Sequence, residues 1–359
     1  MNRKSVPSSL KHFFTAKKIS ILPLHAFLTL FLIVFFHSLL PAASTDSLKY
    51  PVLKRIDRDP IKLTVKKAWE KQLNEKLLSR PFIWQGSAFT VFAGGRIEAF
   101  DLRTGEQKWN REIEDLEGII SLQQGMILAR CGDLLVMLRA EDGVKIRELP
   151  LLPGTLHSYS YENSGIHFLF PDSLWHFDLE AGNFIMDAKI ALKDGKPTSF
   201  VYDGGRYAAF VMSEGRVDVY HVKKGKKLWS FQGGSRILAP PVIWQKKLVV
   251  MCEDNFFYCL DMKNGNLIYR KKSDNRLLYA GEKIRGTILF SPFASKNLTM
   301  LHMATGQLEP VFSLSAERYH FIFPPSYNDD YLVAAYADFF SENNFLIVFE
   351  AEIKEERLF

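Results

Sequence analysis

Three cysteines are the residues of this chain whose spacing bears most directly on redox chemistry. Cys131, Cys252 and Cys259 are not adjacent to one another, so the sequence excludes a vicinal disulfide. Cys252 and Cys259 flank a predicted hairpin, where they could either form a cross-strand disulfide or pack as two small apolar side chains. The sequence leaves that choice open, although disulfide geometry is the more demanding of the two.

The nine histidines give little indication of a metal site. His12, His25 and His37 precede the predicted folded part, and the others have no metal-ligand spacing: His157, His167, His176, His221, His302 and His320. Calcium requires about 6–8 oxygen ligands, and the sequence contains no cluster of carboxylates and amides. Phosphate-loop, nucleophile-elbow and two-histidine zinc motifs are also absent from the sequence. We therefore predict no catalytic, cofactor-binding or metal-binding residues, and no cofactor.

A repeat of about forty residues runs through the chain. Its marker glycines lie at Gly105, Gly143, Gly182, Gly225, Gly265 and Gly306, with spacings between 38 and 43 residues. The clearest copies are residues 96–109, 217–229 and 257–269. Each marker glycine is expected to adopt a positive φ in a tight turn between antiparallel strands.

Other residue types keep fixed positions around these glycines. Asp101, Asp178 and Asp261 precede the glycine by four residues, where a short carboxylate can accept hydrogen bonds from the turn backbone. His221 and His302 take the same position in their units, which favours a structural role for them. Four residues after the glycine come the rings of Trp109, Trp229 and Tyr269, each expected to fill the wedge between neighbouring sheets.

Short β-rich segments lie between the turns: Ser87–Ala93, Gly125–Arg130, Gly165–Phe170, Arg206–Met212 and Lys246–Cys252. No window after residue 70 has a sustained helical period, so few helices are expected. A period near forty with three or four strands per unit is typical of a β-propeller. The predicted fold class is therefore all-β, with mostly four-stranded antiparallel sheets.

The two ends of the repeat region complement each other. Trp69 lies forty residues before Trp109 but lacks the strands that should precede it. The predicted strands Tyr331–Ala337 and Asn344–Ala351 lack the outer strand that should follow them. We expect these N- and C-terminal strands to share one blade and close the ring. Six internal units and one shared unit make seven blades, with eight as the main alternative.

The units resemble the PQQ-type propeller repeat, whose core is roughly Ala-Leu-Asp-x-x-Thr-Gly-x-x-x-Trp. Residues Ala99 to Trp109 fit it with Phe for Leu, Cys259 to Tyr269 fit less closely, and the resemblance covers residues 66–351. It implies either a quinoprotein dehydrogenase or a non-enzymatic, BamB-like scaffold of the outer-membrane β-barrel assembly machinery. Such dehydrogenases are larger and carry a calcium site, and many have adjacent cysteines. The chain is closer in character to the scaffold, although familiar scaffolds are eight-bladed lipoproteins and no lipid-accepting Cys follows the apolar run here.

The N-terminal segment has the features of an export signal. Five basic residues and no acid occupy residues 1–18, and residues 19–40 contain no Asp, Glu, Lys or Arg. Cleavage before Thr45, after Ala42 and Ser44, would make residues 1–44 a signal peptide. Alternatively, residues 19–40 are long enough to anchor the chain in the inner membrane. Residues 45–65 are predicted to be a linker, and residues 66–359 the propeller.

The charge distribution excludes a nucleic-acid-binding domain. Residues 1–80 hold 15 Lys/Arg against 5 Asp/Glu, whereas residues 81–359 hold 31 against 35. A nucleic-acid binder should carry its basic excess on the folded part. The pI of about 9.0 arises instead from the N-terminal segment.

One aromatic segment is a candidate contact surface. Residues 339–345 (FFSENNF) place phenylalanines beside an acidic, Asn-rich turn. Such a segment is typical of protein interfaces, but packing of these rings in the core of the closing blade is the favoured interpretation. The basic turn 223–227 (KKGKK) is expected to be a solvated hairpin tip.

Taken together, the sequence predicts an exported, non-catalytic propeller that is monomeric and binds other polypeptides of the cell envelope, with a periplasmic location. The resemblance adds outer-membrane protein assembly as its setting. The alternatives are a PQQ-dependent oxidoreductase and a membrane-tethered sensor.

Overall fold

The computed structural model describes residues 61–355, apart from 161–164, 193–194 and 342. The chain divides into Met1–Asp57 and Arg58–Phe359, and every described residue lies in the second unit. The predicted export segment 1–44, with its three histidines, and linker residues 45–60 lie outside the described residues. Within the described residues, no helix is both long enough and apolar enough to cross a membrane.

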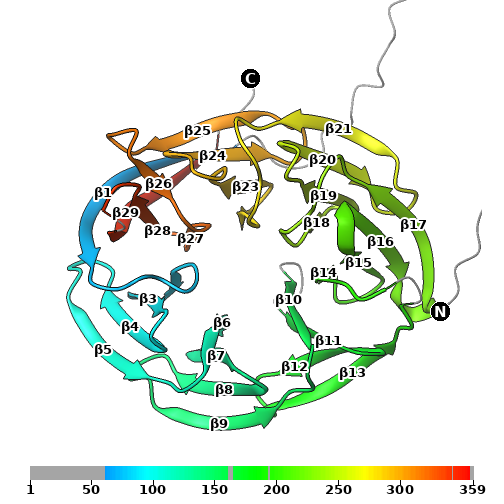
Figure 1. The fold of residues 1–359 in the computed structure, drawn as a ribbon, viewed down its shortest axis with the longest axis horizontal. Helices are drawn as coiled ribbons and strands as arrows, with labels where there is room; N and C mark the ends of the chain where they lie inside the picture. The colour runs from blue at the N-terminus through cyan, green and yellow to red at the C-terminus, as the bar shows by residue number, and fades with distance from the viewer. Residues whose placement is uncertain (1–60, 161–164, 193–194, 342, 356–359) are drawn as a thin grey trace, which may run out of the picture. The chain divides into compact units, whose positions relative to one another are not determined.

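The described unit is a seven-bladed β-propeller (Figure 1). Seven antiparallel sheets surround a common centre, and the described residues add only two short 3-10 helices to the strands. The predicted fold class and seven-blade count are confirmed, and the eight-blade alternative is wrong. All five predicted internal strands are present to within two residues at each end.

Six blades are formed by consecutive strands, and we number them from the N-terminus. Blade 1 contains β2 (Phe82–Trp84), β3 (Ser87–Phe92), β4 (Arg96–Asp101) and β5 (Gln107–Glu112). Blade 2 contains β6 (Leu116–Gln123), β7 (Met126–Cys131), β8 (Leu134–Arg139) and β9 (Lys145–Pro150). Blade 3 contains β10 (Leu156–Ser160), β11 (Gly165–Phe170), β12 (Ser173–Asp178) and β13 (Asn183–Lys189).

The remaining blades continue in the same order. Blade 4 contains β14 (Ser199–Tyr202), β15 (Tyr207–Val211), β16 (Arg216–His221) and β17 (Lys226–Gln232), with the 3-10 helices η1 (Ser213–Gly215) and η2 (Val222–Lys224). Blade 5 contains β18 (Val242–Trp244), β19 (Lys247–Met251), β20 (Phe256–Asp261) and β21 (Leu267–Lys272). Blade 6 contains β22 (Glu282–Ile284), β23 (Thr287–Phe290), β24 (Asn297–His302) and β25 (Leu308–Ser313). The closing blade joins β26 (Tyr319–Phe321), β27 (Ser326–Tyr327), β28 (Tyr331–Asp338) and β29 (Asn344–Glu355) to β1 (Ile61–Leu73).

In every blade, the pairing between the outer strand and its neighbour contains a register shift. In blade 1 it falls between Ala99 and Phe100, and in the closing blade between Lys67 and Trp69. The other blades have the same irregularity between their third and fourth strands. A β-bulge increases local twist, and the outer strands accordingly follow the rim in Figure 1.

The two ends of the propeller close the ring in one long strand pair. β1 pairs antiparallel with β29 from Ile61 opposite Glu355 to Leu73 opposite Asn344, which places Trp69 opposite Val348. The predicted shared blade is therefore confirmed.

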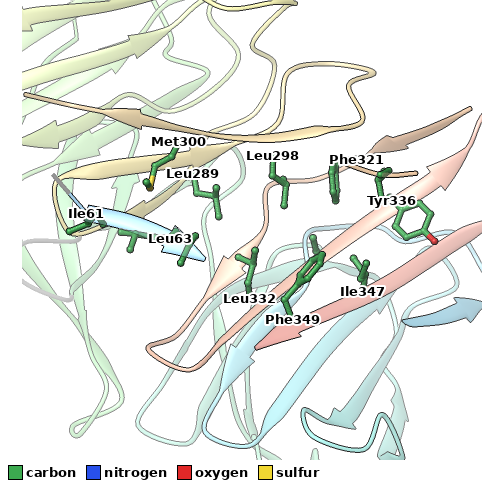
Figure 2. Close-up of a cluster of buried hydrophobic side chains, with 13 residues drawn as sticks. Ile61, Leu63, Leu289, Leu298, Met300, Phe321, Leu332, Tyr336, Ile347 and Phe349 are labelled. Carbon is green, nitrogen blue, oxygen red and sulfur yellow. The ribbon is translucent and has the colours of Figure 1, made fainter. Parts of the chain in front are cut away.

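The predicted linker boundary is wrong for residues 61–65. They belong to β1, and Ile61 and Leu63 are buried. Both side chains join Leu332, Phe349 and neighbouring residues in a hydrophobic cluster between blade 6 and the closing blade (Figure 2). Only Lys62 separates the two apolar residues, and the charged residues before Ile61 mask this short alternation in the sequence.

The inner strand of the closing blade is divided in two. β26 pairs with the end of β28 and β27 with its beginning. Pro324 and Pro325 lie between the two pieces, where the absence of backbone N–H groups interrupts pairing.

Seven hydrophobic clusters fill the seven seams between blades. Each draws its buried side chains from two neighbouring sheets. In the seam between blades 1 and 2, for example, Phe89 and Ile97 face Ile127 and Val136. Every blade therefore contributes side chains to two seams.

The repeat turns have the predicted geometry. All six marker glycines have positive φ, between 56° and 75°. Asp101 Oδ1 accepts hydrogen bonds from the backbone N–H groups of Arg103 and Thr104, and Asp178 and Asp261 do the same in their own turns. These bonds hold the pKa of Asp101 below its ordinary value, with the Thr104 N–H as the largest cause.

In four blades, a Trp or Tyr ring on the outer strand fastens the blade to the next one. Trp109 Nε1 donates a hydrogen bond of 3.1 Å to Ala140 O, three residues before Gly143. Equivalent bonds join Trp69 to Leu102 O, Trp229 to Met262 O and Tyr269 to Met303 O at 2.7–3.1 Å. A Cβ on the facing glycine would lie 2.8–3.0 Å from the ring, so each glycine also admits close packing.

Three seams lack this aromatic fastening, and in blade 6 the ring position is occupied by Pro310. Arg147 takes the ring position in blade 2 and lies against Gly182. In blade 3 the position is occupied by Met186, which is 46% exposed.

We predict that Trp109→Ala destabilises the protein by about 2–4 kcal/mol, because it removes both the ring packing and the hydrogen bond to blade 2. Met186→Ala, at the matched position, should change the free energy of unfolding by less than about 0.5 kcal/mol. Urea unfolding followed by circular dichroism measures both. Equal effects would contradict the proposed fastening role.

An ion pair crosses the closing blade on its inner side. Arg80 Nη1 lies 2.7 Å from Glu282 Oε2, which joins the β1–β2 segment to β22. Nearby, buried Ser326 Oγ donates to Pro81 O at 2.6 Å. Burial raises the pKa of Glu282, and Arg80 opposes that shift. These contacts tie blades 6 and 1 together across β27.

We predict that Arg80→Ala costs about 2–4 kcal/mol at pH 7, because it leaves the Glu282 carboxylate buried without its cation. The pKa of Glu282 would then rise further above its unfolded value. Between the unfolded and the folded pKa of Glu282, the folded variant loses stability as pH rises, because the buried carboxyl must ionise. Acidification towards pH 4 should therefore reduce the loss of unfolding free energy caused by Arg80→Ala. Thermal unfolding from pH 4 to 8 tests this, with the exposed Arg103→Ala as the control. A deficit independent of pH would count against the ion pair.

Candidate functional site

The described residues offer no assembled metal centre. No group of three or more His, Cys, Asp or Glu among them is arranged to hold a metal ion. All three cysteines are free and buried. Cys252 packs in the seam between blades 4 and 5, and Cys259 in the seam between blades 5 and 6, so they lie on opposite faces of one sheet. The cross-strand disulfide considered from the sequence does not form.

The histidines at the turn position have local contacts. His302 Nε2 lies 3.1 Å from Glu309 Oε2 across the β24–β25 hairpin. The His221 ring packs against Tyr207 on the neighbouring strand. Both contacts lie within a single blade, in line with the structural role expected for these residues.

One histidine pair was missed by sequence spacing. His167 on β11 is directly opposite His176 on β12, and their Nδ1 atoms lie 3.4 and 2.8 Å from the two oxygens of Asp187 on β13. His167 also contacts the Tyr202 ring of blade 4, with centroids 4.7 Å apart. Burial acts to raise the pKa of Asp187, but the two imidazoles outweigh it and the net shift is downward. This polar cluster lies in the seam that Met186 leaves without an aromatic fastening.

The sequence feature that could have revealed this histidine pair is its symmetry about the turn of the predicted hairpin. Residues 167 and 176 are symmetric about the Pro171-Asp172 turn, which makes them cross-strand neighbours once the register is known. A search for metal-ligand spacing ignores that symmetry.

The aromatic turn between β28 and β29 is exposed. Phe339 is 52% exposed and Phe340 84% exposed, so the favoured prediction that these rings are core residues is wrong for both. Phe345 differs, because it is partly buried and stacks on Tyr336 with centroids 4.8 Å apart. The end of the strand explains this exposure. β28 ends at Asp338, so the rings of Phe339 and Phe340 belong to the turn rather than to a strand.

The residue at the position of Phe339 makes a different side-chain contact in each of the neighbouring blades. In blade 5, Arg236 on the linker from blade 4 forms a two-point ion pair with Glu253. In blade 6 the equivalent Arg276 lies over the Phe293 ring, with 5.3 Å from Cζ to the centroid. In the closing blade, Phe339 takes the place of Glu253, because its backbone N–H bonds to Arg318 O, but its ring stacks on His320 with centroids 3.9 Å apart. The backbone bond is kept in all three blades, while the side chains at its donor end change from charged to aromatic.

A groove lies at the rim between blades 1 and 2, with a volume of about 520 Å³. One wall is the end of β5 and the following loop, residues 111–115. The floor consists of side chains from β7 and β8, Cys131, Leu134, Val136 and Leu138, and Val144 lines the groove at the β8–β9 turn. We call this the rim groove. The sequence contains its parts, but an opening between sheets depends on how two blades pack.

The rim groove has an acidic edge. Glu112, Glu114 and Asp115 are exposed on the wall, and Glu148 lies opposite them. Burial raises the pKa of the Cys131 thiol to about 11, and the charges of Glu148, Glu117 and Asp115 add to that shift. These carboxylates therefore disfavour the thiolate of Cys131, whereas Lys145 acts in the opposite direction.

Comparison with known families decides the family of this chain. The profile described as "Outer membrane protein assembly factor BamB" matches residues 62–158 and 172–319. The chain belongs to this family. The matched segments contain strands of every internal blade and β1, so the relationship covers most of the propeller.

Solved structures agree with the BamB-type family at the level of fold. The chain is similar to BamB from Moraxella catarrhalis, with a TM-score of 0.52 at 11% identity over 80% of this chain and 98% of that one. It is equally similar to the computationally designed Ika8 protein, with a TM-score of 0.53 at 13% identity over 76% of this chain and 87% of that one. No curated protein matches the sequence. At such low identity these likenesses concern the fold alone.

We predict that the Cys131 thiol resists alkylation at neutral pH. With a pKa near 11, it is protonated at pH 7.5 and ionises only as pH rises towards 11. Iodoacetamide labelling located by mass spectrometry should show slow modification at pH 7.5 and an increase above pH 10. Glu148→Gln should lower the pH at which labelling begins, because among the neighbouring charges that of Glu148 raises the pKa of Cys131 most. Rapid labelling of the folded protein at pH 7.5 would contradict this electrostatic description.

Proposed function

We propose that this protein is an exported, non-catalytic scaffold that binds other polypeptides of the cell envelope during outer-membrane protein assembly. The observation that carries this proposal is membership of the BamB-type family along most of the propeller. Fold alone does not specify an activity, so the surface of the propeller must supply the rest of the support.

The N-terminal sequence supports export. Residues 1–18 are basic and residues 19–40 are apolar, which is the order found in secretory signals. After cleavage before Thr45 the propeller would be periplasmic, and without cleavage residues 19–40 would anchor it to the inner membrane. Either route places the propeller outside the cytoplasm.

The loop surface supports recognition rather than catalysis. Phe339 and Phe340 project from a turn, with His320 stacked behind Phe339. Exposed aromatic side chains are enriched at protein interfaces, where they bury a large area at low entropic cost. The free edges of the outer strands could also pair with an extended peptide. In this proposal a monomeric propeller needs no cofactor and binds no nucleic acid.

The test is cross-linked capture of envelope partners by the full chain expressed at its native level. We predict that Phe339→Ser/Phe340→Ser reduces partner recovery at least about threefold, because the loop loses its buried contact area. The free energy of unfolding should fall by less than about 1.5 kcal/mol, since Phe340 is exposed and Phe339 loses only its stacking on His320. The matched control is Leu267→Ser/Ile268→Ser, which removes two exposed apolar side chains from the outer strand β21.

Recovery of only uncomplexed protein by the unmodified chain would overturn the scaffold proposal. Tight binding of PQQ with calcium, accompanied by dye-linked oxidation of an alcohol or sugar, would replace it with the quinoprotein alternative. Equal loss of partner in both double variants would show that the aromatic loop has no particular role.

A further inference from the structure

The rim groove combines an apolar floor with an acidic wall. Val136 and Leu138 project from β8 into the seam and are almost fully buried, whereas Leu134 and Val144 remain 38% and 42% exposed. Exposed aliphatic side chains within a groove leave apolar area that a partner can bury. Gly143 also lines the groove, and the Trp109 ring covers it.

The charges of the groove do not cancel. Lys145 is paired with Glu148, and Arg111 lies over Gly143. Glu112, Glu114 and Asp115 are exposed, and the described residues provide no salt-bridge partner for them. The wall therefore presents three carboxylates with a single nearby cation, so its charge favours a basic partner.

This wall is particular to blade 1. The matching residues of blade 5 follow from the shared backbone bond, Ile113 N to Gly95 O in blade 1 and Ser273 N to Asn255 O in blade 5. By that alignment, Lys272 and Asn275 stand where blade 1 has Glu112 and Asp115, and only Asp274 matches an acid, Glu114. The repeat itself therefore does not require an acid here, and the acidic wall is not imposed by the fold.

We infer that the rim groove binds an extended segment of a partner polypeptide in which aliphatic residues alternate with Lys or Arg. Alternation places apolar side chains on one side of an extended chain and basic side chains on the other. The apolar side chains cover the exposed parts of Leu134 and Val144, while the basic ones meet the carboxylates of residues 112, 114 and 115. This inference rests on the proposed scaffold function and specifies the chemistry of one class of its partners.

The probe is an eight-residue peptide of alternating lysine and leucine, labelled with fluorescein, and its twin with glutamate in place of lysine. Fluorescence anisotropy with the full chain should show saturable binding of the lysine peptide, weakened as ionic strength rises. The glutamate twin should bind at least about tenfold more weakly, since its charges oppose those of the wall. A photoreactive version of the lysine peptide should cross-link within residues 111–115 or 131–148.

Two pairs of variants separate the contributions of wall and floor. Glu112→Lys/Glu114→Lys should lower the affinity for the lysine peptide at least about tenfold. Leu134→Ser/Val144→Ser should lower this affinity by a similar factor at both low and high salt, because it removes apolar contacts rather than charges. Glu106→Lys/Glu141→Lys makes the same change in net charge at exposed turn positions outside the groove and should alter the affinity less than about twofold. All three pairs alter exposed side chains, and circular dichroism verifies that each remains folded.

The inference is overturned if the two peptides bind equally, if the control pair weakens binding as much as the wall pair, or if cross-links fall outside the groove. Absence of peptide binding, with envelope partners still captured, also overturns it and leaves the scaffold proposal standing. Failure of partner capture together with tight PQQ binding would instead remove the proposed function itself.

Discussion

Each blade of this protein must bury two apolar sheet faces, and only its neighbours can cover them. The seven hydrophobic clusters lie in the seven seams, and each takes side chains from two blades. A thin sheet with two apolar faces is unstable alone, because it leaves too much apolar area in water. The ring satisfies this requirement only when the last blade meets the first. The β1–β29 pairing and the Arg80–Glu282 ion pair therefore stabilise every other seam indirectly.

The local rules of the repeat explain why so much of the fold was predictable. A turn glycine, an aspartate four residues before it and a ring four residues after it are short-range features, and all three have the expected roles. Trp69 was informative for the same reason, since its spacing from Trp109 placed it on an outer strand. The other strands of its blade were predicted at the C-terminal end of the chain, so closure of the ring could be predicted as well.

The surface was harder to predict, because exposure depends on where a strand ends. Phe339 and Phe340 have the composition of core residues, but β28 ends just before them and their side chains project from a turn. His167 and His176 became neighbours only through the β11–β12 register. The start of β1 was misplaced for a related reason, since Ile61 and Leu63 follow the charged segment 54–59 and are separated by Lys62, which suggested a charged linker. The rim groove depends on packing between two blades, which no single repeat encodes.

The seams differ in how firmly they are joined, and this has consequences for function. Rings of Trp or Tyr fasten four seams with a hydrogen bond to the next blade. The seam between blades 3 and 4 has Met186 at that position, and buried His167 contacts the Tyr202 ring of blade 4 instead. Seams with fewer apolar contacts are the ones in which local opening costs least. The rim groove adjoins a seam that Trp109 fastens, so its walls are held at a fixed separation. A fixed groove loses less entropy on binding than a mobile one, and a partner segment can therefore be selected by side-chain chemistry rather than by remodelling of the ring.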